Sequence, residues 1–111
     1  MGQPEISPML FLSTAHLRKE TAEAMDLVRV SRQEEEGQRH HVLPEGHPLQ
    51  LVSFDCIEYG YLVWVTDDEG LLKSMPEEIA AAIRFAKQHG CRYIKFDCDV
   101  ERIDELPSWD W

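Results

Sequence analysis

The chain has 111 residues, 43% of them hydrophobic, which is the size and composition of a single small domain with its own core. Its 21 acidic residues outnumber 11 basic ones, so the formal net charge is −10. A protein of this charge lacks the basic surface with which nucleic-acid-binding proteins neutralise phosphates, and anionic membranes repel it. The composition therefore argues against direct contact with nucleic acid or with membranes.

Targeting signals and cofactor motifs are missing from the sequence. The longest apolar run, residues 61–65, is much shorter than the roughly 20 residues that span a membrane, and no basic region followed by an apolar one marks the N-terminus. The three cysteines are odd in number and form no CxxC pair, which favours reduced thiols; Cys56 and Cys98 are expected on the inward faces of strands. We therefore expect a cytoplasmic protein that needs no cofactor.

The first half of the chain predicts one strand, one helix and one long loop. Residues 9–12 are wholly apolar, so we expect a short strand that is buried on both faces. An apolar stripe from Leu17 to Val28 predicts a helix over residues 16–30. Residues 31–49 are polar and then rich in proline and glycine, which is typical of a flexible loop inserted into the domain.

The second half predicts a hairpin, a helix and a final strand. Residues 51–57 alternate between apolar and polar side chains, whereas residues 61–65 are apolar on both faces. Residues 74–77 fit a capping box that begins a helix, and Gly90 is suited to the position just after its end. Residues 91–98 alternate again, which predicts a strand with one exposed face.

These elements follow the order of the ferredoxin-like split βαβ fold, β-α-β-β-α-β. That topology places the first and third strands at the centre of the sheet and the second and fourth at its edges. The two strands that are apolar on both faces are the first and the third, in agreement with it. We therefore predict a single α+β domain over residues 1–111, a sandwich with two helices on one face of a four-stranded sheet.

Four histidines are weak candidates for a metal site. His40, His41 and His47 lie within eight residues of one another, and His16 follows the first predicted strand. Imidazoles at such spacing can bind a transition metal. Because no cysteine pair brackets them, the simpler interpretation is a solvated loop for the first three and capping or packing for His16, and we predict no metal.

Three aspartates suggest an alternative, enzymatic function. Asp97 and Asp99 are expected on one face of the last strand, and Asp55 lies on another strand. Three carboxylates can hold Mg²⁺ in a small metal-dependent hydrolase or nuclease. A phosphodiester substrate needs basic neighbours, however, and only Arg92 and Lys95 are close in sequence.

The C-terminal segment carries half of the net charge. Between Asp97 and Trp111 six acids face one base, and residues 99–111 are expected to form an acidic arm. Tryptophan is a common interface anchor, and acids speed the encounter with a basic protein. A solvated run of charge, with a tryptophan folded back over the core, is the simpler alternative. The candidate partner-binding residues are Asp97, Asp99, Glu101, Asp104, Glu105, Trp109, Asp110 and Trp111.

Three segments also point to a family: LFLSTAHL at residues 10–17, FAKQHGC at residues 85–91 and DELPSWDW at residues 104–111. They resemble a family of small uncharacterised bacterial proteins, a domain of unknown function that is associated with plasmids and integrated mobile elements. The resemblance spans most of the chain except residues 31–49. It implies an accessory role on a mobile element and carries no established catalytic residues.

The leading hypothesis is a non-enzymatic binding protein that engages a basic protein. In an anti-defence inhibitor (anti-restriction or anti-CRISPR) carboxylates imitate phosphates, and this nucleic-acid mimic occupies the basic groove of a nuclease or a CRISPR complex. An antitoxin-like regulator that binds a basic toxin is closely related. Alternatives are the metal-dependent hydrolase and a structural homo-oligomer, such as a homodimer in which edge strands 51–57 or 91–98 pair across a two-fold axis.

Overall fold

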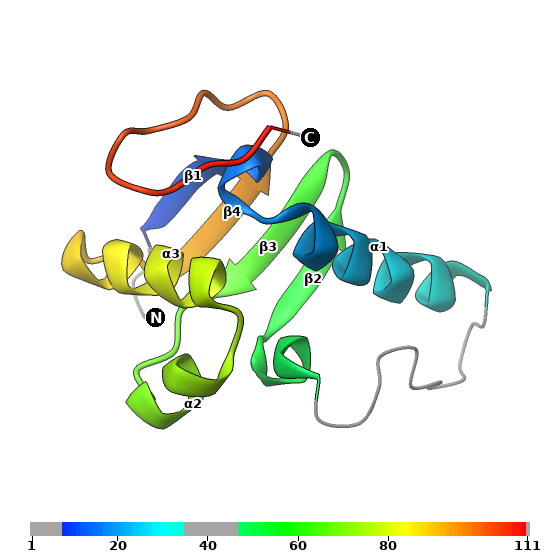
Figure 1. Cartoon of the computed structure of the whole chain (residues 1–111), viewed down its shortest axis with the longest axis horizontal. Coiled ribbons are helices and arrows are strands. Elements are labelled where there is room, and N and C mark those ends of the chain that lie inside the picture. The colour runs from blue at the N-terminus through cyan, green and yellow to red at the C-terminus, as the bar shows by residue number, and fades with distance from the viewer. Residues whose placement is uncertain (1–7, 35–46, 111) are drawn as a thin grey trace, which may run out of the picture.

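The computed structural model describes residues 8–34 and 47–110, without the side chains of residues 29–34, and shows one mixed four-stranded sheet with three helices (Figure 1). The α+β class predicted from the sequence is therefore confirmed. Two short 3-10 helices, η1 (Thr14–His16) and η2 (Pro48–Leu51), connect larger elements. In chain order these are β1 (Met9–Ser13), α1 (Lys19–Glu34), β2 (Phe54–Ile57), β3 (Gly60–Trp64), α2 (Glu69–Ser74), α3 (Glu77–Gln88) and β4 (Tyr93–Asp97).

The order of the strands differs from the ferredoxin-like prediction. The sheet runs β1-β4-β3-β2, with β1 parallel to β4 and the other neighbours antiparallel. The first strand is therefore an edge strand and the last is central, which reverses their predicted places. Met9 and Phe11 are 38% and 53% exposed, because the helices cover only the face of β1 that carries Leu10 and Leu12. The apolar run on β1 thus marks an uncovered sheet face and not a central strand.

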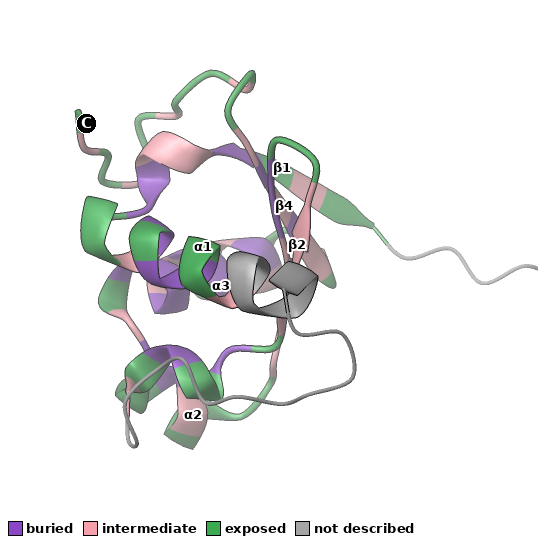
Figure 2. Ribbon diagram, turned by 90° about the vertical axis from the view of Figure 1, so that its right-hand side faces the viewer, coloured by how far each residue is buried: buried purple, intermediate pink, exposed green. Residues whose placement is uncertain are grey.

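Helices α1 and α3 pack on one face of the sheet, and α2 lies beside α3 on the same side (Figure 2). The helices therefore cover one face, as predicted, with α2 as an additional member. No helix in residues 8–34 and 47–110 is long and apolar enough to cross a membrane. The core between helices and sheet includes the fully buried Leu12, Met25, Val63, Ile79, Ile83, Ile94 and Phe96.

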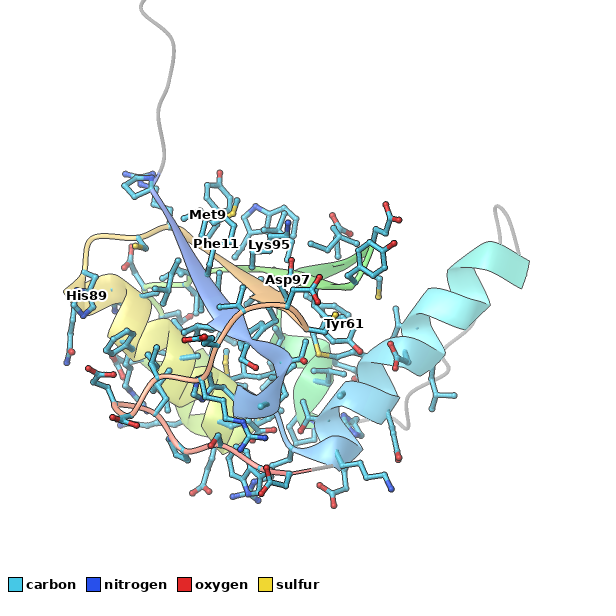
Figure 3. The ribbon with its side chains drawn as sticks, turned by 90° about the horizontal axis from the view of Figure 1, so that it is seen from above. Met9, Phe11, Tyr61, His89, Lys95 and Asp97 are labelled. Carbon is cyan, nitrogen blue, oxygen red and sulfur yellow. The ribbon has the colours of Figure 1, made fainter. Side chains whose placement is uncertain are left out.

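The opposite face of the sheet is not covered by any of the described helices. Phe11, Lys95 and Asp97 project from this open face, away from α1 and α3 (Figure 3). The Lys95 ammonium lies 5.8 Å from the centre of the Phe11 ring and 3.6 Å from the Asp97 carboxylate. Farther along the face, Trp64 on β3 is the register partner of Tyr93 on β4. The open face therefore combines aromatic side chains with paired charges.

Helix α3 has the apolar stripe and the end that the sequence predicts. The Gly90 backbone adopts a φ of +71°, a conformation that favours glycine. The N–H groups of Gly90 and Cys91 donate to the carbonyls of Lys87 and Ala86 at 3.0 and 2.8 Å, which closes the helix as a Schellman motif. The buried stripe consists of Ile79, Ala82, Ile83 and Ala86.

The capping box predicted at residues 74–77 is wrong. Ser74 instead ends α2, a helix that the sequence analysis missed, and Pro76 precedes α3 without a side-chain cap. The Asp68 carboxylate caps α2, because it accepts the N–H of Gly70 at 2.9 Å. An acidic turn that looks like the end of a hairpin is therefore the start of a short helix.

Three further boundaries differ from prediction. Helix α1 begins after η1 and runs to Glu34, so the first part of the predicted loop at residues 31–49 is helical. At the other end of that loop η2 buries Leu49, while residues 35–46 lie outside the described residues. Cys98 is exposed in a turn beyond β4, and not inward on the strand, because the Asp97 carboxylate accepts the Asp99 N–H and starts the turn.

Glu78 is a buried carboxylate that joins α3 to the start of α1. Its side chain is only 3% exposed and lies 3.9 Å from the Arg18 guanidinium. It accepts the Arg18 main-chain N–H at 3.4 Å and the Thr21 hydroxyl hydrogen. Because the first N–H groups of a helix have no partner within it, and its N-terminus carries partial positive charge, this carboxylate stabilises the start of α1.

Replacing Glu78 by alanine should lower the free energy of unfolding by about 2 kcal/mol, since two donors lose their buried acceptor. Urea denaturation followed by circular dichroism measures the change. The matched control is Glu77→Ala, at the preceding residue. The Glu77 side chain is 89% exposed and makes an exposed ion pair with Arg18 at 3.5 Å. That control should change stability by less than about 0.5 kcal/mol; equal effects of both substitutions would contradict this role for Glu78.

Substitution of Gly60 tests the close approach of β3 to β4. A Cβ at this position would lie 1.7 Å from the Phe96 carbonyl oxygen, so the two central strands can pair here only without a side chain. Gly60→Ala should therefore cost more than about 3 kcal/mol in urea denaturation. Gly70→Ala, where the nearest atom is an Asp68 carboxylate oxygen at 3.1 Å, should cost less than about 1 kcal/mol. A fully stable Gly60→Ala protein would refute the register given above.

Candidate functional site

The acidic C-terminal segment is folded against the domain as a loop without helix or strand, and residues 98–110 are called the C-terminal loop below. Figure 1 shows this loop leaving the end of β4, arching beside β1 and returning to η1. At its far end the Trp109 N–H donates to the Ala15 carbonyl at 2.9 Å. Ile103 and Leu106 pack against the core. The loop therefore has a defined position over the first strand and its 3-10 turn.

His16 holds the C-terminal loop at two points. Its ring is 2% exposed, and Nδ1 lies 2.8 Å from the Pro107 carbonyl oxygen. Nε2 accepts the Ile103 N–H at 3.1 Å. Because a carbonyl can only accept and an N–H can only donate, these partners specify a neutral imidazole with its proton on Nδ1. Both ring nitrogens are used by the main chain, so His16 is a packing residue and offers no free atom to a metal.

Trp109 contributes to the packing at the start of α1. Its indole is partly buried, and the Arg18 guanidinium carbon lies 5.2 Å from the ring centre. Arg18 and Trp109 also line a hollow of about 370 Å³ beside α1. This placement agrees with the simpler alternative of a tryptophan folded back on the domain. Trp111 lies outside the described residues.

The acidic side chains of this region divide into paired and unpaired ones. Asp97 pairs with Lys95 at 3.6 Å, and Asp110 pairs with Arg102 at 2.5 Å. The other four are exposed and form no ion pair with any described residue. We call them the loop carboxylates: Asp99, Glu101, Asp104 and Glu105. They project unpaired charge from a loop whose backbone is fixed, and they form the candidate functional site.

The candidate metal ligands are only partly brought together. Asp97, Cys98 and Asp99 offer ligand atoms within 4.8 Å of one another. Asp55 is not a member of this group, because β3 separates its strand from β4, a distance of two strand spacings or about 10 Å. Asp99 does not share a strand face with Asp97, since β4 ends at Asp97.

Of the remaining histidine candidates, one has a structural role in the described residues. The His47 Nδ1 caps η2 by accepting the Leu49 N–H at 3.1 Å. His40 and His41 lie outside the described residues. The expected pairing of strand 91–98 with a second copy is wrong, because β4 is central and both of its edges are already paired; β2, within residues 51–57, is an edge strand.

Neither Glu78 nor the role of His16 as a partner of two main-chain groups was predicted from the sequence. Glu78 had a signal: it lies four and eight residues before Ala82 and Ala86, on the buried stripe of α3, where a carboxylate needs a partner. His16 had none, because its partners Ile103 and Pro107 are far away in the sequence and belong to no regular element.

His16→Ala should release the C-terminal loop and destabilise the domain by about 2–4 kcal/mol, because the Ile103 N–H and the Pro107 carbonyl both lose a buried partner. Urea denaturation gives the loss of stability, and amide hydrogen exchange should become faster at Ile103 and Trp109. His89→Ala, at an exposed histidine far from the C-terminal loop contacts, is the control: it loses the contact of its ring with Phe85, should cost less than about 1 kcal/mol and should leave exchange at Ile103 unchanged. Unchanged exchange at Ile103 in His16→Ala would contradict the clamp.

Comparisons with known proteins identify a family for the chain. A search of the curated proteins and a search of the solved structures each found no match. A family match extends over residues 9–111, from the first residue of β1 through the C-terminal loop. The chain therefore belongs to the family described as Family of unknown function (DUF5983) C-terminal domain.

Proposed function

We propose that this protein is a small, non-enzymatic binding protein that docks onto a basic protein through its loop carboxylates. The observation that carries the proposal is the exposure of Asp99, Glu101, Asp104 and Glu105 without ion pairs on a loop that His16 fixes to the core. Charge without an internal partner is available to an external one.

The fixed position of the C-terminal loop favours binding. A disordered acidic tail loses conformational entropy when it docks, and this loss weakens the complex. Here the loop is already ordered by the bonds of His16, by the Trp109 N–H bond to Ala15 and by the packing of Leu106. A partner therefore meets carboxylates that are already in place.

The uneven distribution of charge supports a basic partner. From residue 97 to residue 111 six acids face Arg102 alone, which amounts to half of the net charge of −10. Such a field raises the rate of encounter with a positively charged surface and repels acidic proteins. A nuclease groove, a CRISPR complex and a basic toxin present surfaces of this kind.

Within this class we favour an anti-defence inhibitor that acts in the bacterial cytoplasm on behalf of a mobile element. The segments at residues 10–17, 85–91 and 104–111 carry the resemblance that implies such an element. In an anti-restriction or anti-CRISPR protein that works by nucleic-acid mimicry, carboxylates occupy the phosphate positions of a DNA-binding groove. An antitoxin-like regulator uses the same surface chemistry against one basic toxin.

The test compares two fourfold variants that change the net charge equally. The loop variant carries D99N, E101Q, D104N and E105Q; the control variant carries E23Q, D55N, E58Q and E69Q at exposed acids that line neither the loop nor a hollow. The assay measures DNA cleavage by a panel of restriction endonucleases and CRISPR nucleases with each protein added. Wild type and control should inhibit a member of the panel, while the loop variant should be about 100-fold weaker, since four charge contacts at about 0.7 kcal/mol each are lost.

Salt dependence completes this test. Inhibition by wild type should weaken as salt rises from 50 to 500 mM, because exposed charges are screened. Equal potency of the loop variant and wild type, or a complex that ignores salt, would show that another surface binds. Failure to inhibit any nuclease in the panel would count against the anti-defence version. Equal thermal melting of both variants confirms that each is folded.

The metal-dependent hydrolase remains a second candidate, since Asp97, Cys98 and Asp99 place ligand atoms within 4.8 Å of one another. Against it, Asp97 already pairs with Lys95 and accepts the Asp99 N–H, and Asp55 lies two strands away. Thermal melting with Mg²⁺, Mn²⁺ and Zn²⁺ decides between the two functions, because a metal that binds the folded protein must raise its melting temperature.

A further inference from the structure

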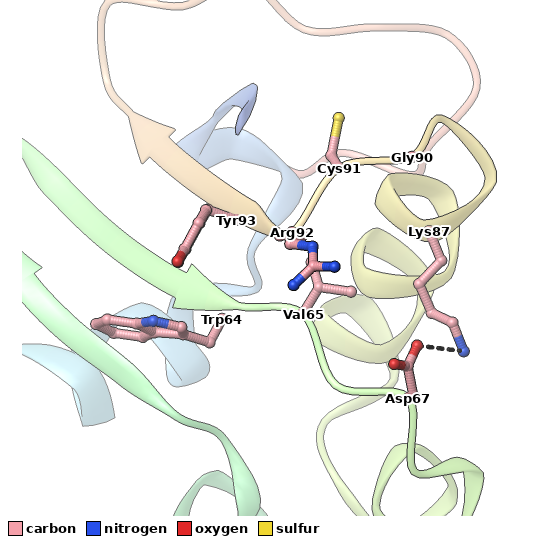
Figure 4. Close-up of a pocket in the computed structure, with 8 residues that line it drawn as sticks. All are labelled: Trp64, Val65, Asp67, Lys87, Gly90, Cys91, Arg92 and Tyr93. Carbon is pink, nitrogen blue, oxygen red and sulfur yellow. Dashed lines mark ion pairs between the residues drawn. The ribbon is translucent and has the colours of Figure 1, made fainter. Parts of the chain in front are cut away.

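A hollow of about 400 Å³ lies at the end of the sheet opposite the point where the C-terminal loop leaves β4 (Figure 4). It opens where β3 ends, where β4 begins and where α3 finishes, and its size is within the range of small-molecule sites. Its lining includes the ring pair Trp64 and Tyr93 and three charged side chains, Asp67, Lys87 and Arg92. The hollow is separate from the loop carboxylates, so what it binds is independent of the proposed function.

Basic side chains outnumber acidic ones among the residues that line this hollow. Lys87 and Arg92 outnumber Asp67, which leaves a surplus of one positive charge in a chain of net charge −10. The Lys87 ammonium lies 3.7 Å from the Asp67 carboxylate and 3.9 Å from the Glu69 carboxylate. These long separations leave it able to contribute to the binding of an anion.

Arg92 is the distinctive side chain of the hollow. It is exposed, and its guanidinium forms no hydrogen bond or ion pair with residues 8–28 or 47–110, although that part of the chain is rich in carboxylates. Figure 4 shows the guanidinium in the middle of the lining residues. A guanidinium presents its donors in a planar fork that matches the oxygens of a phosphate or carboxylate.

Trp64 and Tyr93 form an aromatic wall beside Arg92. They are register partners on β3 and β4, and their rings meet edge to face with centres 6.1 Å apart at an angle of 72°. This contact limits the movement of both rings, and both side chains remain partly exposed. A planar ring from a ligand can stack on such a wall, an interaction that holds nucleobases on many protein surfaces.

From these features we infer that the hollow binds a small anion that carries a planar ring, the chemistry of a nucleoside monophosphate. The ring stacks on the Trp64 and Tyr93 wall, and the anionic group receives hydrogen bonds from Arg92. Lys87 adds attraction at longer range. A polymeric nucleic acid does not fit the same description, since the acidic C-terminal loop repels a chain of phosphates.

The test uses ¹H–¹⁵N spectra of the full chain with adenosine monophosphate as the probe. The Trp64 indole signal, identified by its loss in Trp64→Phe, and the main-chain signals of Gly90 and Arg92 should shift until saturation, with a Kd below about 1 mM. The signal of the Trp109 indole, which lies in the C-terminal loop beside α1, should not shift and serves as an internal control. Adenosine alone and inorganic phosphate alone should each bind at least about tenfold more weakly, because each supplies one of the two contacts.

Substitutions locate the site. Arg92→Gln should weaken binding of adenosine monophosphate at least about tenfold, through loss of a charge-assisted hydrogen bond. Arg84→Gln is the control: it removes an exposed arginine that pairs with Glu69 and does not line the hollow, and it should bind like wild type. The fourfold loop variant should also bind the nucleotide normally, so the two proposals can fail separately.

Three outcomes would overturn the inference. The first is no shift of the Trp64 indole at millimolar nucleotide, and the second is equal binding by Arg92→Gln and wild type. The third is a single-stranded oligonucleotide that binds far more tightly than the mononucleotide, which would make the hollow part of a strand-binding face.

Discussion

The position of the C-terminal loop depends on two hydrogen bonds made by one buried imidazole. A loop without helix or strand must satisfy its main-chain groups outside regular structure. His16 supplies one donor and one acceptor on opposite sides of a rigid ring, and it bonds to Ile103 and Pro107 at once. It thereby satisfies main-chain groups of the loop, as a neighbouring strand satisfies those at the edge of a sheet. Together with the Trp109 N–H bond to Ala15 and the packing of Leu106, this clamp holds the loop carboxylates on a fixed backbone.

The sheet separates two ends of different chemistry. At the C-terminal end of β4 the loop carboxylates concentrate negative charge, and at its N-terminal end the hollow around Arg92 carries a positive surplus. Between these ends the open face is largely apolar, with Lys95 and Asp97 compensating each other. Half of the net charge of −10 lies in residues 97–111, and the sum for the whole chain conceals the two basic side chains of the hollow. A protein of this kind has room for two ligands of opposite sign that do not compete.

Local patterns predicted the local structure of this fold. The buried stripe of α3, its end at Gly90 and the antiparallel hairpin of β2 and β3 follow from side-chain periodicity and turn chemistry within a few residues. The strand order did not follow, because alternation reports which faces are covered and says nothing about which strands are neighbours. β1 is apolar on both sides, yet Phe11 faces the open side of the sheet. The place of β1 at the edge of the sheet is set by its pairing with β4, which lies far along the chain.

In the candidate sites, too, local features could be predicted and contacts between distant segments could not. The concentration of charge after Phe96 was visible in composition, but the clamp that fixes it joins His16 to residues 87 and 91 positions away and left no trace in the sequence. The hollow around Arg92 was missed because its walls come from three elements whose ends meet only in the folded chain.

The parallel pairing of β1 with β4 also sets the order in which the domain can be completed during synthesis. The hairpin of β2 and β3 joins neighbours in sequence and can form early, whereas the first strand must wait for the last. The hydrogen bond between His16 and Pro107 can form only later still, after Pro107 has left the ribosome. The C-terminal loop therefore cannot take its position until residues 103–107 have been synthesised, so the candidate binding surface is among the last parts of the described chain that can form.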